Sequence, residues 1–230
     1  SNGVETLENM TVFPQGGVSR RNGSRFVCEV KDSTAITRLI PFEFNITQAY
    51  VLEFGNNYIR FLKDNGQITE ATKTISGITA ANPAVVTATS HGYSDGDDVW
   101  IADIVGMTRL NGRRFTVANK TTNTFQLTGE NSTSYTAWSS GGTASKAYQI
   151  TTTYTSAELY DLQFTQSADV MYIVHPDHPP AKLSRTAHTT WTLADVDFTN
   201  GPYLDTNTTA TTISTSAHTV GTGITMTASA

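Results

Sequence analysis

The chain has 230 residues, of which 38% are hydrophobic and 15% are charged, and its formal net charge is −5. This length is enough to bury a real core in one large or two smaller domains, and the low charge argues against disorder driven by charge repulsion. The acidic balance argues against general affinity for nucleic-acid phosphates. No apolar run is long enough to span a bilayer, and the single cysteine excludes an internal disulfide framework.

Threonine and serine take the place of many hydrophobic residues in this composition. Threonine is β-branched and fits a pleated, half-wet surface, so its abundance favours exposed β structure. The sequence therefore predicts an all-β protein.

The first segment, residues 4–38, is predicted to contain short β segments broken by glycine pairs and turns. Its apolar run at residues 26–28 includes the only cysteine, Cys28, which we expect to behave as a small buried hydrophobe rather than as a reactive thiol. Three arginines lie in or beside a glycine-bearing loop, where they can hold an acidic neighbour or a phosphate. The favoured interpretation is a solvated basic loop formed by Arg20, Arg21 and Arg25.

Residues 38–67 carry the clearest strand pattern outside the central stretch. Apolar and polar residues alternate over 50–54 and again over 58–61, with a hairpin turn at 55–57 and a second turn at 64–66. Because two strands are not stable alone in water, we expect this hairpin to belong to a larger sheet.

Residues 78–143 alternate short β-branched and aromatic runs with turn signals, such as Asp95-Gly96 and Asn111-Gly112. The pattern predicts a small closed β-barrel. Its predicted core consists of Val99, Ile101, Phe115, Val117, Phe125 and Leu127. Residues 74–77 and 141–145 have the small side chains expected of flexible junctions on either side.

Strand-like alternation resumes at residues 147–152, and residues 156–162 are predicted to form a short helical turn with Ser156 as its N-cap. Strands follow at 170–174, near 182–183 and at 191–193. This order of strand, tight turn, strand and Trp-bearing strand resembles a β-propeller blade. Such a scaffold tolerates a compact insert where the two ends of the insert lie close together.

The last part, from Gly201, is rich in threonine, serine, alanine and glycine, and predicts thin β structure or an edge. This part has few side chains that could be buried in a core. Because the strand pattern stops without completing, we expect the chain to be a fragment of a longer protein. The apolar residues concerned are Ile213, Val220, Ile224 and Met226.

The central stretch also carries a family resemblance. It contains, in order, NPAVVTATSHGYSDGDDVWI, GMTRLNGRRFTVAN and NTFQLTG. This order resembles the FCCH module, the first catalytic cysteine half-domain named after ubiquitin-activating E1 enzymes, and most of all the version inserted in bacteriophage and prophage structural proteins. The resemblance does not imply the chemistry of the whole enzyme. Cys28 lies outside the module, and the chain has no Gly-rich phosphate loop followed by Lys-Ser or Lys-Thr.

A second resemblance rests on motifs that occur together at residues 15–17, 20–26, 39–42 and 50–55. They read QGG, RRNGSRF, LIPF and YVLEFG, and they resemble the start of tail structural proteins of short-tailed phages and prophages, in the tail-tube or nozzle class. The resemblance implies a ring-forming conduit assembled around DNA, and it brings no catalytic residues.

Two groups of residues raise the question of a metal site. His175, Asp177 and His178 offer imidazole and carboxylate ligands that suit zinc, but prolines hold this loop extended and no second ligand cluster is near in sequence. Asp95, Asp97 and Asp98 surround Gly96 as in a calcium loop, but lack its later bidentate Glu. The favoured interpretation is an ordinary turn in both places, so no metal site is predicted.

Other candidates have similarly plain interpretations. His91 precedes Gly92 at a predicted turn, where a structural role is favoured over a catalytic one. Four aromatic residues can form a sugar-binding platform if they share one exposed face, although such residues more often complete a core. They are Tyr93, Trp100, Tyr135 and Trp138.

Together these observations predict a β-sheet scaffold, residues 1–77 and 147–230, with a small β-barrel inserted at 78–146. We expect a non-enzymatic structural component of a phage or prophage tail, without catalytic residues, cofactor or metal. It would assemble as a homo-oligomer with other tail subunits, allow DNA to pass without binding it specifically, and have no membrane partner. Its place would be the tail of the virion, assembled in the bacterial host cytoplasm. The alternative is a receptor- or glycan-binding module of a phage particle.

Overall fold

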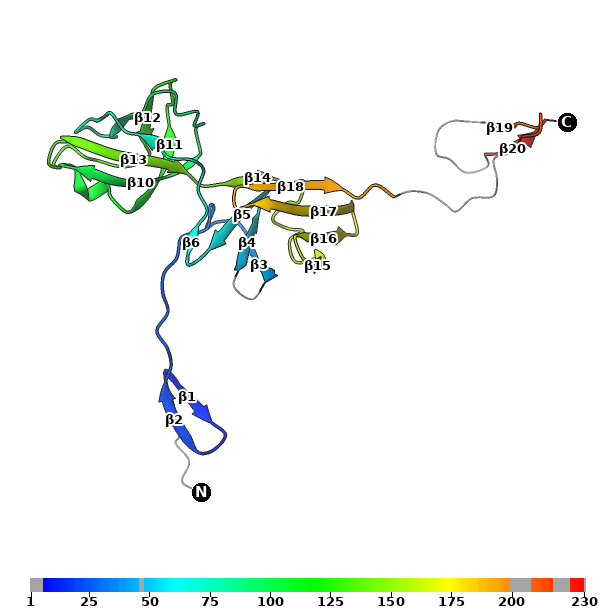
Figure 1. Cartoon of the computed structure of the whole chain (residues 1–230), viewed down its shortest axis with the longest axis horizontal. Helices are drawn as coiled ribbons and strands as arrows, with labels where there is room; N and C mark the ends of the chain where they lie inside the picture. Colours follow the sequence, from blue (N-terminus) through cyan, green and yellow to red (C-terminus); the bar gives the residue numbers. More distant parts are fainter. Residues whose placement is uncertain (1–5, 46–47, 199–207, 217–223, 230) are drawn as a thin grey trace. The chain divides into compact units, whose positions relative to one another are not determined.

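The computed structural model describes residues 6–45, 48–198, 208–216 and 224–229 (Figure 1). The chain divides into two compact units, residues 1–196 and 197–230. The described residues form strands and a single 3₁₀ turn, η1 (Thr108–Leu110), so the all-β prediction is confirmed. They include no helix long and apolar enough to cross a membrane.

The central stretch forms one seven-stranded antiparallel sheet, which we call the module. Its strands follow one another across the sheet in the order β7 (Lys73–Thr74), β13 (Ser140–Lys146), β10 (Asp98–Val105), β11 (Arg113–Ala118), β12 (Thr124–Leu127), β9 (Val85–Thr87) and β8 (Gly77–Ile78). The sheet thus includes Lys73, which precedes the predicted start of the insert. All six side chains predicted to form the core are buried in one cluster.

The sheet of the module is open, so the predicted closed barrel needs a correction. Its two outer strands, β7 and β8, do not pair with each other, and only Ile75 and Ser76 separate them in the chain. The N–H of Ile75 donates to Gly142 O at 2.9 Å and the N–H of Ser76 donates to Thr87 O at 2.9 Å. These two residues therefore join the edges of the sheet without completing a ladder.

The glycines at the predicted junction 141–145 lie inside strand β13 and serve close packing. Gly142 has a φ of +108°, and a Cβ built there would lie 2.9 Å from Cγ1 of Ile104. Residues 74–77 likewise contribute to β7 and β8. The prediction of flexible junctions was wrong because small residues here make room for a neighbouring strand.

Two further sheets share a second core and form what we call the scaffold. One contains β14 (Gln149–Thr151), β5 (Tyr58–Lys63), β4 (Gln48–Gly55) and β3 (Arg38–Asn45) in this order, with β6 (Gly66–Gln67) pairing with β5. The other is a meander of β15 (Gln163–Ser167), β16 (Val170–His175), β17 (His178–Ala187) and β18 (Thr190–Asp195). These elements confirm the predicted strands and the hairpin turn, where Asn57 has a φ of +62°.

Trp191 connects the two scaffold sheets. Its ring stacks on Phe61 with centroids 4.3 Å apart and meets Phe42 edge-on at 4.8 Å. Aromatic contacts of this kind add to the stabilisation from buried area. The hairpin at residues 50–61 and the later meander therefore belong to one folded body.

Two local predictions were wrong. Residues 156–161 form turns rather than a helical turn capped by Ser156, and Thr155 donates its N–H and its hydroxyl to the carboxylate of Glu158 at 2.7 and 2.8 Å. Residues 21–30 form no strand, and Cys28 is half-buried instead of lying in a core. Its pKa is raised, first by burial and then by the nearby charge of Glu53.

Two small hairpins complete the described structure. Strands β1 (Met10–Phe13) and β2 (Gly17–Arg20) pair with each other, as do β19 (Ile213–Thr215) and β20 (Met226–Ala228). All residues of these four strands are exposed. The thin β structure predicted for the end of the chain is found at Ile213 and Met226, whereas Val220 lies outside the described residues.

Replacing Gly142 with alanine should destabilise the protein by about 2–4 kcal/mol, because the new Cβ adds a clash with Ile104 to a backbone conformation that L-residues rarely adopt. Gly129→Ala is the matched control: its φ is +71°, but a Cβ there meets nothing within 4 Å. Urea unfolding followed by tryptophan fluorescence measures both. Equal losses in the two variants would contradict the packing role of Gly142.

Candidate functional site

The module is joined to the scaffold by two chain segments that run side by side. The N–H of Glu70 donates to Lys146 O at 2.7 Å, and the N–H of Tyr148 donates to Ile68 O at 2.9 Å. Between them, Thr69 and Ala147 form an isolated antiparallel bridge. The chain therefore enters and leaves the module at one place.

A buried ion pair lies at this junction. Nη2 of Arg60, on β5, is 2.7 Å from Oδ2 of Asp98, at the start of β10, and the two side chains are 1% and 8% exposed. The other oxygen of Asp98 accepts the hydroxyl of Thr116 at 3.1 Å, and Nε of Arg60 donates to Gln149 at 3.2 Å. The pair therefore links an inner strand of the scaffold sheet to an inner strand of the module sheet.

A second polar group fixes residues 29–31 at the same place. Glu53 is buried and accepts the hydroxyl of Tyr58 at 2.6 Å and the N–H of Lys31 at 3.1 Å. Burial, and then the hydrogen bond to Glu53, raise the pKa of Tyr58. On the module, Arg114 donates to Glu29 O at 2.6 Å and to Val30 O at 3.2 Å.

A groove of about 780 Å³ adjoins this junction. Residues 25–29 and 65–67 line it together with Trp100 and Arg114 of the module. Cys28 lies on its wall, so the thiol faces a groove rather than the core that the sequence predicted.

The aspartates considered as a calcium loop have different partners. Asp95 accepts the N–H of Lys120 at 2.9 Å, Asp97 accepts the N–H of Ser94 at 2.8 Å, and Asp98 pairs with Arg60. The three aspartates around Gly96 therefore have structural partners: Asp95 and Asp97 stabilise turns, and Asp98 forms the ion pair at the junction.

His91 is buried beside the core of the module. Its Nδ1 accepts the N–H of Tyr93 at 3.0 Å, its Nε2 lies 3.2 Å from Thr124 O, and its ring meets Phe125 edge-on. These contacts give it the structural role that the sequence favoured.

The four candidate aromatics do not share one exposed face. Tyr93 is only 4% exposed and donates its hydroxyl to Ala144 O, whereas Trp100 is 44% exposed. Tyr135 and Trp138 are partly buried against the core of the module. A platform of all four side chains is therefore not formed.

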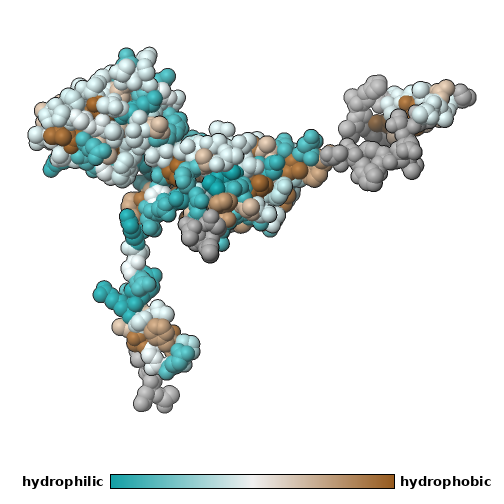
Figure 2. Space-filling model, viewed as in Figure 1, coloured by the Kyte–Doolittle hydropathy of each residue, from teal (hydrophilic) through white to brown (hydrophobic). Residues whose placement is uncertain are grey.

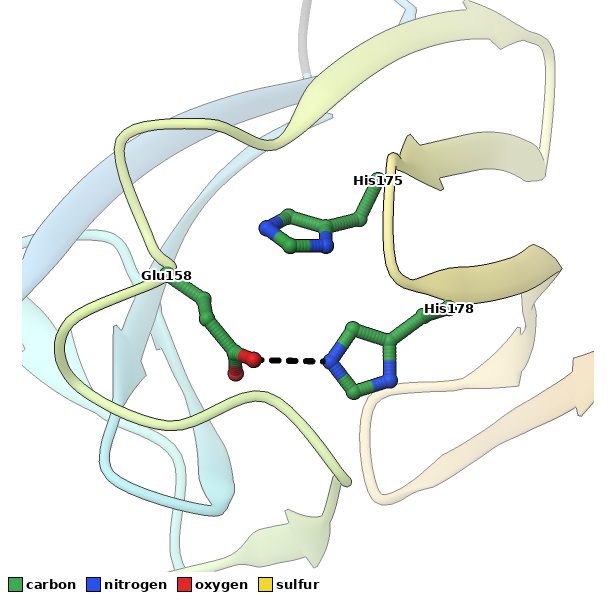
Figure 3. Close-up of side chains that lie close together, drawn as sticks. All are labelled: Glu158, His175 and His178. Carbon is green, nitrogen blue, oxygen red and sulfur yellow. Dashed lines mark hydrogen bonds and ion pairs between the residues drawn. The ribbon is translucent and has the colours of Figure 1, made fainter.

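The turn between β16 and β17 brings His175 and His178 together, with ring centroids 5.0 Å apart. The loop before β15 adds Glu158, whose Oε1 lies 3.2 Å from Nε2 of His178 (Figure 3). One ligand atom from each of the three residues lies within 4.8 Å of the others. Hydrogen bonds from Thr155, and then the contact with His178, lower the pKa of Glu158 to about 2, so its carboxylate is charged.

Sequence reasoning identified the two histidines but missed Glu158. The available signal was Thr155-x-x-Glu158, the spacing at which a capping threonine holds a glutamate, although here it orders a turn and not a helix. Its distance from His178 along the chain hid the contact.

Comparison with known proteins bears on the module alone. Residues 81–147 match the family model of the ubiquitin-activating enzyme E1 FCCH domain, which is a non-catalytic module. The resemblance found in the sequence is thereby confirmed for this part. No curated protein matches the chain.

Replacing Asp98 with alanine should destabilise the protein by about 3–5 kcal/mol, because Arg60 would keep a buried charge without a partner. Removing both charges, as in Arg60→Met with Asp98→Ala, should restore part of the loss. Glu70→Ala is the control, since Glu70 is 43% exposed in its pair with Lys146 and should change stability by less than about 1 kcal/mol. Urea unfolding that gave the same small loss for Asp98→Ala would refute the role of the pair.

Proposed function

We propose that the protein is a non-enzymatic structural component of a phage or prophage tail, which assembles with copies of itself into a ring or conduit. The inserted module would serve as a surface or inter-subunit contact. The matched FCCH module supports a non-catalytic role for that part, and its fixed attachment through Arg60 and Asp98 suits a part that must present one surface to a neighbour.

The observation that carries the proposal is the hairpin of β1 and β2. Each of its residues is exposed, and its apolar side chains are 48–62% exposed at Met10, Val12, Phe13 and Val18. Figure 2 shows hydrophobic surface on this hairpin. Because an isolated two-stranded hairpin is marginal in water, this one gains its stability most simply by pairing with or packing on a second copy of the chain.

The scaffold has two outer strands, which are partly joined to each other by hydrogen bonds between Glu43 of β3 and Gln166 of β15. Strand β3 is the outer strand of its sheet, and Leu39 on it is 61% exposed. Strand β15 is the outer strand of the meander, and Phe164 on it is 38% exposed. Edge strands with exposed apolar side chains are suited to closed-ring assembly, in which each edge is covered by a neighbour.

The remaining parts of the proposal rest on the sequence. A net charge of −5 is compatible with a conduit through which DNA passes without tight binding of its phosphates. The partners would be other tail subunits, and the site of action would be the virion tail, assembled in the bacterial host cytoplasm. The alternative, a receptor- or glycan-binding module, has less support because the four aromatics do not form one platform.

Electron microscopy and light scattering on the purified chain should reveal a discrete cyclic oligomer. Val12→Asp with Val18→Asp should shift it toward monomers, because these residues are cross-strand partners on one face of the hairpin. Thr11→Asp with Ser19→Asp adds the same charge on the other face and should leave assembly unchanged. A wild-type chain that stays monomeric, even with tail subunits added, would count against the proposal.

A further inference from the structure

The turn from β16 to β17 holds its two histidines in register. His175 ends β16 and His178 begins β17, and the two residues are paired across the hairpin. Figure 3 shows both rings facing the loop that carries Glu158. The proline-bearing turn thus presents two imidazoles, rather than one, to a carboxylate on a separate loop.

His175 has a ring nitrogen that lacks a partner. The side chain is 8% exposed, and its Nδ1 accepts the N–H of Asp177 at 3.1 Å. Its Nε2 is buried without a hydrogen-bond partner. Buried polar atoms in proteins nearly always have a partner, and this one lies beside a second histidine and a carboxylate, where a ligand can engage it once the ring changes its tautomer.

We infer that Glu158, His175 and His178 bind a divalent transition-metal ion, with Zn²⁺ as the best fit. Two imidazoles and one carboxylate are a zinc donor set, and three protein ligands leave one tetrahedral position for water. This inference departs from the sequence expectation of no metal site, and it is independent of the proposed tail function.

The geometry is close to what zinc requires. Bonds of about 2.0–2.1 Å in a tetrahedron place neighbouring donor atoms roughly 3.3 Å apart, and Oε1 of Glu158 already lies 3.2 Å from Nε2 of His178. The three donors lie within 4.8 Å of one another, so closure requires a modest approach by side-chain rotation. The side chains of Glu158 and His178 are 26% and 19% exposed, which leaves them room to adjust.

Surrounding groups orient two of the ligands. Oε2 of Glu158 accepts the N–H and hydroxyl of Thr155, which leaves Oε1 for the ion. Nδ1 of His178 lies 3.4 Å from the hydroxyl of Thr153. Once Nε2 binds the metal ion, the ring proton is on Nδ1, and this hydroxyl can accept a hydrogen bond from it. Partners of this kind fix the tautomer and direction of a metal-binding histidine.

His175 must change its hydrogen bonding to join them. In the ion-free ring the proton is on Nε2, since Nδ1 accepts the N–H of Asp177. Coordination through Nε2 moves that proton to Nδ1 and gives up the Asp177 bond. A bound ion would then tie the loop at Glu158 to the β16–β17 hairpin and stabilise the folded state by mass action.

The test uses the whole chain, freed of metal with a chelator and titrated with Zn²⁺ by calorimetry and thermal unfolding. We expect one Zn²⁺ per chain and a rise in Tm of several degrees. His178→Ala and Glu158→Gln, both partly exposed positions, should weaken binding roughly tenfold or more. Asp177→Asn removes a charge from the same turn, and this control should bind Zn²⁺ as the wild type does.

Co²⁺ titration adds a direct readout, because a His-and-carboxylate site gives a visible absorption band that is lost in the same two variants. His175→Ala reports on the third ligand if circular dichroism shows a native spectrum, and the other two variants decide the outcome if it does not. The inference is overturned if wild type shows no Zn²⁺ binding, if both variants bind as tightly as wild type, or if Mg²⁺ raises Tm equally.

Discussion

The buried contact between Arg60 and Asp98 is the interaction on which the joining of module and scaffold depends. Both charges are largely buried, so each requires the other, and the additional bonds to Thr116 and Gln149 fix the direction of approach. The two charges come from central strands of two different sheets. Any displacement of one sheet against the other would therefore separate them, and this makes the pair a constraint on geometry more than a source of stability.

The polar character of the junction follows from the presence of two separate hydrophobic cores. One cluster lies wholly within residues 75–144 and the other within residues 40–62 and 154–191. Each body buries its own apolar side chains, so the junction can be built from charges, amides and backbone hydrogen bonds. This separation also explains physically how a family match can cover residues 81–147 alone. A unit with its own core needs only a compatible pair of chain ends and a few polar partners in its host.

Much of this fold could be predicted because local pattern and tertiary role agree. Alternation predicted β4 and β5, and the six core residues of the module follow from the same period of two. The open edge of the sheet could not be predicted, because β7 and β8 have two residues each and carry no periodic signal. The role of Gly142 was predicted wrongly for a related reason. Composition cannot distinguish a glycine in a flexible junction from a glycine that leaves space for the side chain of Ile104.

The junction and the candidate metal cluster each contain a buried nitrogen without a hydrogen-bond partner, but the surroundings of the two nitrogens differ. Arg60 also has an unpartnered nitrogen, Nη1, but Asp98 neutralises its guanidinium charge and Tyr58 lies beneath it. In His175 one ring nitrogen accepts a local hydrogen bond and the other has no partner, and the residue lies close to a carboxylate and a second imidazole. The first arrangement is complete without a ligand, since its charges cancel. The second keeps one buried ring nitrogen without a hydrogen bond, next to two groups that commonly bind metal ions.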